Sequence, residues 1–275
     1  MENKLTGAEI KAYEKELQKQ ELASNTIKKY LRELNNLIKY LDANNLKLDK
    51  DSLIDYKDKL EDEYKPNTLN NKIIILNKYL TYKGLDSLKL KQVKQQVNHN
   101  TDNVMTDTDF NRILRQAEKK GTSRDKVMLL SLYYTGLRVS ELEFLTVESV
   151  KKGYITVKNK GKIRKVPIAK KLDKELKAYV KEQGIEKGAI ILNRNNEPLS
   201  RNYIFKRLKW LGGQARVKKS KVYPHSIRHL FAKQWLKANG DNYLQLADIL
   251  GHSSLETTRI YSRMNTDEMR DTINF

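Results

Sequence analysis

Apolar residues recur at helical spacing through the first 85 positions and predict a bundle of four or five helices. Thr6 and Glu9 form a capping box that starts a first helix, which runs to about Gln20. A second helix begins near residues 24–26, and its apolar residues keep a 3.6-residue period at Ile27, Tyr30, Leu31, Leu34, Leu37, Ile38 and Leu41. A third opens at residues 51–52, and a fourth runs from Pro66 towards Gly84 because proline suits the first helical turn.

The periodicity is lost over residues 91–104, where the chain becomes polar and carries His99. Such a stretch is typical of a linker. We therefore predict two domains, residues 1–90 and residues 105–275, joined by residues 91–104.

The second domain is predicted to be helical with a small sheet. Thr106 and Ser123 are expected to cap two helices, and Gly136 to end the second of them. Alternating apolar and polar positions over 154–158 and 163–168 predict a β-hairpin, and a short strand is expected at 190–192. Further helices are predicted at about 171–183, 200–211, 226–238 and 242–250. The fold class is thus mainly α with a small β-sheet.

The last predicted helices meet at Gly251, a residue that tolerates the left-handed conformation in which helices end. Ser253 and Ser254 can cap the helix that follows. This arrangement leaves His252 at a helix junction and Tyr261 near the end of a short helix. Neither position is unusual by itself.

Composition adds a strong positive charge. The chain holds 54 Lys and Arg against 34 Asp and Glu, a net charge of +20, and residues 151–221 alone hold 22 basic and 5 acidic residues. Such a segment repels itself unless a polyanion neutralises it, so nucleic acid is the favoured partner. The alternatives are an anionic membrane as the partner, or a basic surface that only keeps the protein soluble. The chain has no cysteine, which excludes disulfides and thiolate sites. It shows no apolar run of membrane-spanning length, so we predict a soluble cytoplasmic protein associated with the nucleoid and no membrane contact.

Two groups of polar residues are candidates for DNA contact. One group lies on the polar faces of the second and fourth helices and the other in the hairpin: Lys28, Lys29, Arg32, Asn71, Lys72, Lys162 and Arg164. A basic, Asn-rich helix face can enter the major groove. An ordinary solvated helix face would have the same composition.

Candidate chemistry comes from scattered cationic residues and one phenol, namely Arg138, Lys160, His225, Arg228, His252 and Tyr261. The His-x-x-Arg spacing of His225 and Arg228 places both on one face of the first turn of a helix. Arginine forks bind two phosphate oxygens each and stabilise a pentacoordinate transition state. Because no acidic cluster of the two-metal kind is evident, we predict a site for one phosphodiester that uses no metal and no cofactor.

Four motifs in order resemble those of the tyrosine recombinases of the phage integrase and Xer type. Residues 135–142 (TGLRVSEL) match the first arginine box, and 159–161 (NKG) resemble the hairpin lysine motif. Residues 225–229 (HSIRH) match the second box, and 250–261 (LGHSSLETTRIY) match the nucleophile segment. Residues 1–90 resemble the core-binding domain, which has a SAM-like helical fold, and residues 105–275 the catalytic domain with a C-terminal helix. Two departures are Leu230, where threonine is common, and a hairpin one residue shorter than in Xer proteins.

The resemblance implies roles for these residues. Tyr261 would attack the scissile phosphate to form a 3′-phosphotyrosyl link, and Lys160, with Lys162 as its rival, would protonate the leaving 5′ oxygen. Arg138 and Arg228 would bind the nonbridging oxygens. His225 would accept the tyrosine proton or hydrogen-bond the phosphate, and His252 would donate to the phosphate. Glu141 is expected to orient its neighbours, and His229 to pack beside them.

The resemblance also implies a site-specific recombinase that acts on double-stranded DNA sites through a Holliday junction, without ATP. The expected assembly is a homotetramer on DNA, and a monomer or dimer when free, with accessory DNA-bending or directionality proteins as candidate partners. Integration, excision and dimer resolution all remain open, as does a place in a mobile element. Type IB topoisomerase activity and DNA binding without catalysis are the competing functions. A C-terminal apolar stripe, which could pack in cis or against a neighbouring protomer, comprises Met264, Met269, Ile273 and Phe275.

Overall fold

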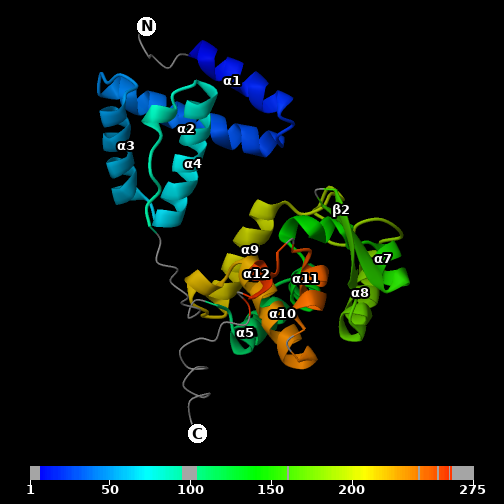
Figure 1. The fold of residues 1–275 in the computed structure, drawn as a ribbon. Helices are drawn as coiled ribbons and strands as arrows, with labels where there is room; N and C mark the ends of the chain where they lie inside the picture. Colours follow the sequence, from blue (N-terminus) through cyan, green and yellow to red (C-terminus); the bar gives the residue numbers. More distant parts are fainter. Residues whose placement is uncertain are drawn as a thin grey trace. The chain divides into compact units, whose positions relative to one another are not determined.

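The computed structural model describes residues 7–94, 104–159, 161–240, 242–252, 254–259 and 261. The chain divides into two compact units at residues 98 and 99 (Figure 1). The predicted linker over residues 91–104 lies mostly outside the described residues, as do Thr6 of the first capping box, Ser253 and the C-terminal apolar stripe. Each unit is described by itself.

The N-terminal unit is a helical bundle. Its elements are α1 (Gly7–Lys19), α2 (Ser24–Ala43), α3 (Lys50–Glu63), α4 (Pro66–Tyr82) and the short 3-10 helix η1 (Asp86–Leu88). Helix α3 begins before the expected position because the Asp49 side chain accepts a hydrogen bond from the Ser52 amide and caps it (2.8 Å). Leucines at helical spacing on α2, α3 and α4 close the bundle core around Leu34, Leu53 and Ile73.

The C-terminal unit contains helices around one hairpin. Its elements are α5 (Asp107–Lys120), α6 (Ser123–Thr135), η2 (Val139–Phe144), α7 (Val147–Lys152), β1 (Tyr154–Asn159), β2 (Lys162–Pro167), α8 (Lys170–Gln183), α9 (Arg201–Gln214), η3 (Lys219–Lys221), α10 (Pro224–Asn239), α11 (Tyr243–Leu250) and α12 (Leu255–Arg259). The two strands pair antiparallel, from Tyr154 opposite Pro167 to Asn159 opposite Lys162. The predicted fold class, mainly helical with a small sheet, is confirmed.

Local sequence signals explain where these elements begin. Capping boxes start α5 and α6, with Thr106 and Thr122 accepting from the amides of Asp109 and Asp125. The expected cap at Ser123 was therefore one residue late. The expected strand at 190–192 was wrong: in the described part of the chain this segment forms isolated bridges, because it pairs with a loop at Leu145 and with Pro198 and not with a full strand.

Three helix ends meet at one place in this unit. The end of α6 meets α10 where Arg228 donates to the Gly136 carbonyl, the end of α11 meets β2 where Arg164 donates to the Ile249 carbonyl, and α12 follows α11. These are the segments that carry the predicted catalytic residues. The fold therefore brings chain positions more than 120 residues apart to a single region.

Candidate active site

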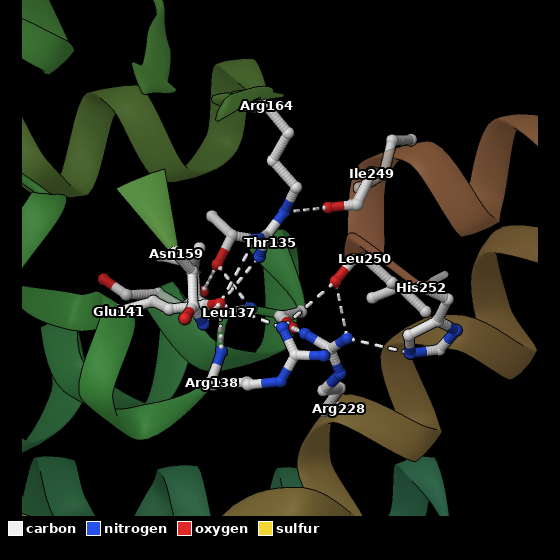
Figure 2. Close-up of polar contacts among 12 residues, drawn as sticks. Thr135, Leu137, Arg138, Glu141, Asn159, Arg164, Arg228, Ile249, Leu250 and His252 are labelled. Carbon is white, nitrogen blue, oxygen red and sulfur yellow. Dashed lines mark hydrogen bonds and ion pairs between the residues drawn. The ribbon is translucent and has the colours of Figure 1, made fainter. Parts of the chain in front are cut away.

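Arg228 lies at the centre of this region. It belongs to the first turns of α10, which begins at Pro224, and its side chain is almost fully buried, at 1% exposure. One terminal nitrogen donates to the Gly136 carbonyl (2.7 Å) and the other to the Leu250 carbonyl (2.7 Å). Burial and the nearby charge of Arg138 lower the pKa of Arg228 to about 10, while the phenol of Tyr261 acts in the opposite direction. The guanidinium therefore stays charged at neutral pH and joins the ends of α6 and α11 (Figure 2).

Gly136 allows this junction to form. Its φ of 61° lies in the left-handed region, where a side chain is strained, and its carbonyl faces Arg228. A Cβ atom here would collide with the Phe231 ring. Conformation and space both require glycine at the end of α6.

Arg138 and Glu141 form the next part of the site. The Arg138 amide donates to Glu141 Oε2 (2.8 Å), and its guanidinium donates to Oε1 (2.9 Å) and to the Leu250 carbonyl (3.4 Å). The Arg138 side chain keeps 38% of its surface exposed, whereas that of Glu141 keeps 1%. Arg138 is thus held by its neighbours while part of its side chain stays exposed, as an anion-binding residue requires.

Arg164 also binds Glu141, which sequence reasoning missed. Its guanidinium donates to both carboxylate oxygens (3.1 and 2.7 Å) and through Nε to the Ile249 carbonyl (2.8 Å) (Figure 2). Burial would raise the pKa of Glu141, but hydrogen bonds from Arg164 and Arg138 outweigh it and lower the pKa to about 2. Arg164 was expected to contact DNA; in this structure its side chain binds a buried carboxylate, and the DNA contact stays a prediction.

His252 bonds to neighbours through both ring nitrogens. Nε2 lies 3.0 Å from a terminal nitrogen of Arg228, and Nδ1 lies 2.9 Å from the Thr258 hydroxyl. Because arginine can only donate, Nε2 is the acceptor and the ring proton belongs on Nδ1. Burial and the charges of Arg228 and Arg138 lower the pKa of His252 to about 4, so the ring is neutral at pH 7.

Tyr261 lies beside these residues but is buried. Its ring packs edge-on against His229 (4.5 Å between centroids) and nearly parallel to His252 (5.8 Å), and it is 3% exposed. Burial lowers the pKa of His229 to about 4. His229 is therefore a neutral ring packed against the phenol.

A pocket of about 550 Å³ opens in front of the arginines. Arg138, His225 and Arg228 line one side of it, and burial together with the two guanidinium charges lowers the pKa of His225. Arg201, Asn202 and Phe205 of α9 also line the pocket. Sequence reasoning missed these three; Arg201 and Asn202 are of the residue types chosen as DNA-contact candidates, but the apolar Phe205 is not. Tyr261 does not line the pocket.

The structure describes only one of the two candidate lysines of the hairpin. Lys160 lies outside the described residues, whereas Lys162 is exposed at the start of β2. The hairpin itself reaches the site through Arg164 and Asn159, whose amide lies 3.4 Å from Glu141 Oε1.

The N-terminal candidates for DNA contact separate by exposure. Lys28, Lys29, Arg32 and Asn71 are exposed. Lys72 is buried, and its ammonium binds Glu33 and lies over the Tyr64 ring (4.4 Å). Lys72 was expected to contact DNA; in this structure its charge is neutralised inside the bundle, and the DNA contact stays a prediction.

The described residues contain no helix that is long and apolar enough to cross a bilayer. Within the same residues, no cluster of three or more His, Asp or Glu side chains is placed to hold a metal ion.

Comparison with known proteins gives two family matches. Residues 103–268 match the model of the phage integrase family, and residues 10–84 match that of the phage integrase N-terminal SAM-like domain. The chain is 30% identical to the tyrosine recombinase XerA of Pyrococcus furiosus over 217 residues, which is 76% of this chain and 74% of that protein. It is 37% identical to the tyrosine recombinase XerD of Staphylococcus aureus over 160 residues, 55% of this chain and 54% of the relative.

Solved structures show the same fold. The XerH site-specific recombinase bound to its difH substrate, in a pre-cleavage complex, matches with a TM-score of 0.73 at 18% identity, covering 98% of this chain and 85% of that one. A lambda integrase dimer bound to a COC′ core site matches with a TM-score of 0.75 at 19% identity, covering 95% and 78%.

Proposed function

Because the chain belongs to the phage integrase family of tyrosine recombinases, we propose that it cleaves and rejoins DNA at specific sites through a 3′-phosphotyrosyl intermediate. The observation that carries the proposal is the meeting of Arg138, Arg228, His252 and Tyr261 at the junction of three helix ends. The recombinases of similar structure that are bound to DNA support double-stranded DNA as the partner.

In the proposed cleavage step a phosphodiester occupies the pocket. Arg138 and Arg228 bind its nonbridging oxygens and stabilise the negative charge of the pentacoordinate transition state. The Tyr261 oxygen forms a bond to phosphorus as the bond from phosphorus to the 5′ oxygen breaks, and His225 accepts the phenol proton. Lys160 gives a proton to the 5′ oxygen. A phenol is both an accessible nucleophile and a good leaving group, so the link retains the energy for rejoining without ATP.

Three features of the unbound site must change when DNA binds. Tyr261 is 3% exposed and does not line the pocket, so it must shift to reach a phosphate there; Arg228 lines the pocket but is only 1% exposed, so its guanidinium must also become more accessible. His252 accepts from Arg228 through Nε2, so donation to the phosphate requires the ring proton on that nitrogen. The negative charge of the bound phosphate favours a proton on Nε2.

Recombination is proposed to proceed in a tetramer on two DNA sites, through a Holliday junction. Trapping of a covalent complex on a nicked suicide duplex tests the chemistry, and strand exchange between two labelled duplexes tests recombination. Relaxation of any supercoiled plasmid without site preference or exchange would instead indicate a topoisomerase. Binding without an adduct would indicate an idle DNA-binding protein.

Lys160 is expected to act as the general acid. Lys160→Ala should slow cleavage of an ordinary substrate by about 10²- to 10³-fold, because the 5′ alkoxide then leaves without a proton. A substrate with sulfur as the 5′ bridging atom releases a thiolate, which needs no acid, and should restore the rate. Lys162→Ala, measured on both substrates, is the matched control and should resemble the wild type. If the sulfur substrate restored the cleavage rate of Lys162→Ala but not that of Lys160→Ala, Lys162 and not Lys160 would be the general acid.

The basic surface predicts steep salt dependence. If six or more phosphates are contacted, affinity for the site should fall by about a thousandfold or more between roughly 50 and 200 mM salt. Lys28→Gln should reduce the logarithmic slope by about one. Lys57→Gln is the control, since Lys57 is paired with Glu61 on the acidic helix α3. A flat salt response would contradict extensive phosphate contact.

A further inference from the structure

Glu141 accepts hydrogen bonds from both strands of the hairpin. From β1, the Asn159 amide donates to Oε1 (3.4 Å), and from β2 the Arg164 guanidinium donates to both oxygens (3.1 and 2.7 Å). The same carboxylate accepts the two bonds from Arg138. Five donors thus converge on one buried carboxylate, and three of them belong to the hairpin (Figure 2).

These anchors flank the turn of the hairpin. Asn159 directly precedes Lys160 and pairs with Lys162, and Arg164 follows two residues later. Side chains alternate across a strand, so Asn159 and Arg164 share the inner face with the buried residues Val157 and Val166. The turn is therefore bounded on both sides by a residue that binds Glu141.

Apolar packing does not hold the tip of the hairpin. Val157 and Val166 are buried, but Ile163, the large apolar residue nearer the turn, is 67% exposed, and Lys158 opposite it is exposed too. Ile155, further from the turn, is buried in the core as well, whereas nearer the turn Asn159 and Arg164 bind the rest of the unit through hydrogen bonds. Among the described residues next to the turn, Asn159 and Arg164 are therefore held through Glu141.

Arg164 also ties the hairpin to the nucleophile segment. Its Nε donates to the Ile249 carbonyl near the end of α11 (2.8 Å). Two residues further on, Gly251 has a φ of 67°, and a Cβ there would lie 2.9 Å from Arg164. The side chain therefore fills the space that the missing Cβ leaves, next to His252.

We propose that Asn159 and Arg164 are positioning residues that act through Glu141 to hold the acid-bearing turn in register with Arg138. The proposal rests on the proposed function, in which Lys160 protonates the 5′ oxygen of a phosphate bound by Arg138. One carboxylate orients the phosphate-binding arginine and fixes both ends of the turn. Proton delivery is thereby coupled to phosphate binding.

The test compares two single-turnover cleavage rates for each variant, on an ordinary nicked duplex and on one with a 5′ bridging sulfur. Asn159→Ala and Arg164→Gln should slow oxygen cleavage by about 10-fold and 100-fold, part of the contribution of general acid catalysis. Sulfur cleavage should fall much less, so the oxygen-to-sulfur rate ratio should drop several-fold or more in both. Lys158→Gln and Lys165→Gln change the exposed neighbours on the same strands and should keep the wild-type ratio.

An equal loss on both substrates would overturn the proposal, because a purely structural defect lowers both rates together. Should Arg164→Gln fail to fold, Asn159→Ala decides alone, since it removes one of the five donors to Glu141. Failure of the proposed function would look different: the wild-type protein would then form no covalent complex on either substrate.

Discussion

Replacing Tyr261 with phenylalanine is expected to abolish covalent attachment of the protein to DNA and to leave DNA binding intact. The change removes one oxygen, the atom that would bond to phosphorus, and keeps the ring that packs against His229 and His252. Loss of a nucleophile of this kind lowers the rate by on the order of 10⁴-fold or more. The measurement is the fraction of labelled suicide DNA that migrates with the protein on a denaturing gel, beside a binding assay on the same duplex.

Tyr243→Phe is the matched control. Tyr243 packs against the same small cluster as Tyr261 and also loses only a hydroxyl in this variant. It should form the adduct at close to the wild-type rate. An adduct that persists in Tyr261→Phe and is lost in Tyr243→Phe would show that the nucleophile was misassigned.

Local chemistry along the chain was sufficient to predict most elements of the fold. The helix period, the capping threonine at 106 and Pro66 fixed where helices begin, and glycines at 136 and 251 fixed where they end. The caps and the helix-ending glycines act over a few residues and the helix period over one continuous segment, so all of them are visible without a structure. The errors at Asp49 and Thr122 were small because neighbouring residues could also act as caps.

Pairing between distant side chains could not be predicted in this way. Arg164 and Lys72 both lie on elements whose exposed faces are basic, and their sequence environments resemble those of Lys162 and Lys28. What separates them is a buried carboxylate, Glu141 for one and Glu33 for the other, from a segment 23 or 39 residues away. For the same reason, the sequence did not indicate that residues of α9 line the pocket. The catalytic candidates were easier to identify from the sequence, because the family motifs already specify their spacing.

Arg228→Lys is expected to retain the fold and DNA binding but to lose cleavage by on the order of 10²- to 10³-fold. The guanidinium spans two carbonyls, of Gly136 and Leu250, and meets His252, whereas an ammonium on a flexible stem cannot reproduce this fork. Lysine is preferred to alanine, which would leave both buried carbonyls without a donor at about 1–3 kcal/mol each. The measurement is single-turnover cleavage of suicide DNA, with thermal unfolding recorded in parallel.

Arg207→Lys separates lost chemistry from lost structure. Arg207 makes a bidentate pair with the buried carboxylate of Asp125 in the same unit and does not line the pocket. This variant should lower the unfolding temperature and leave the cleavage rate close to that of the wild type. On a substrate with a neutral methylphosphonate at the scissile position, the cleavage rates of Arg228→Lys and of the wild type should differ less. This substrate lacks the charge that Arg228 is proposed to stabilise. If Arg228→Lys cleaved ordinary DNA at the wild-type rate, the Arg228 guanidinium would have no role in stabilising the transition state.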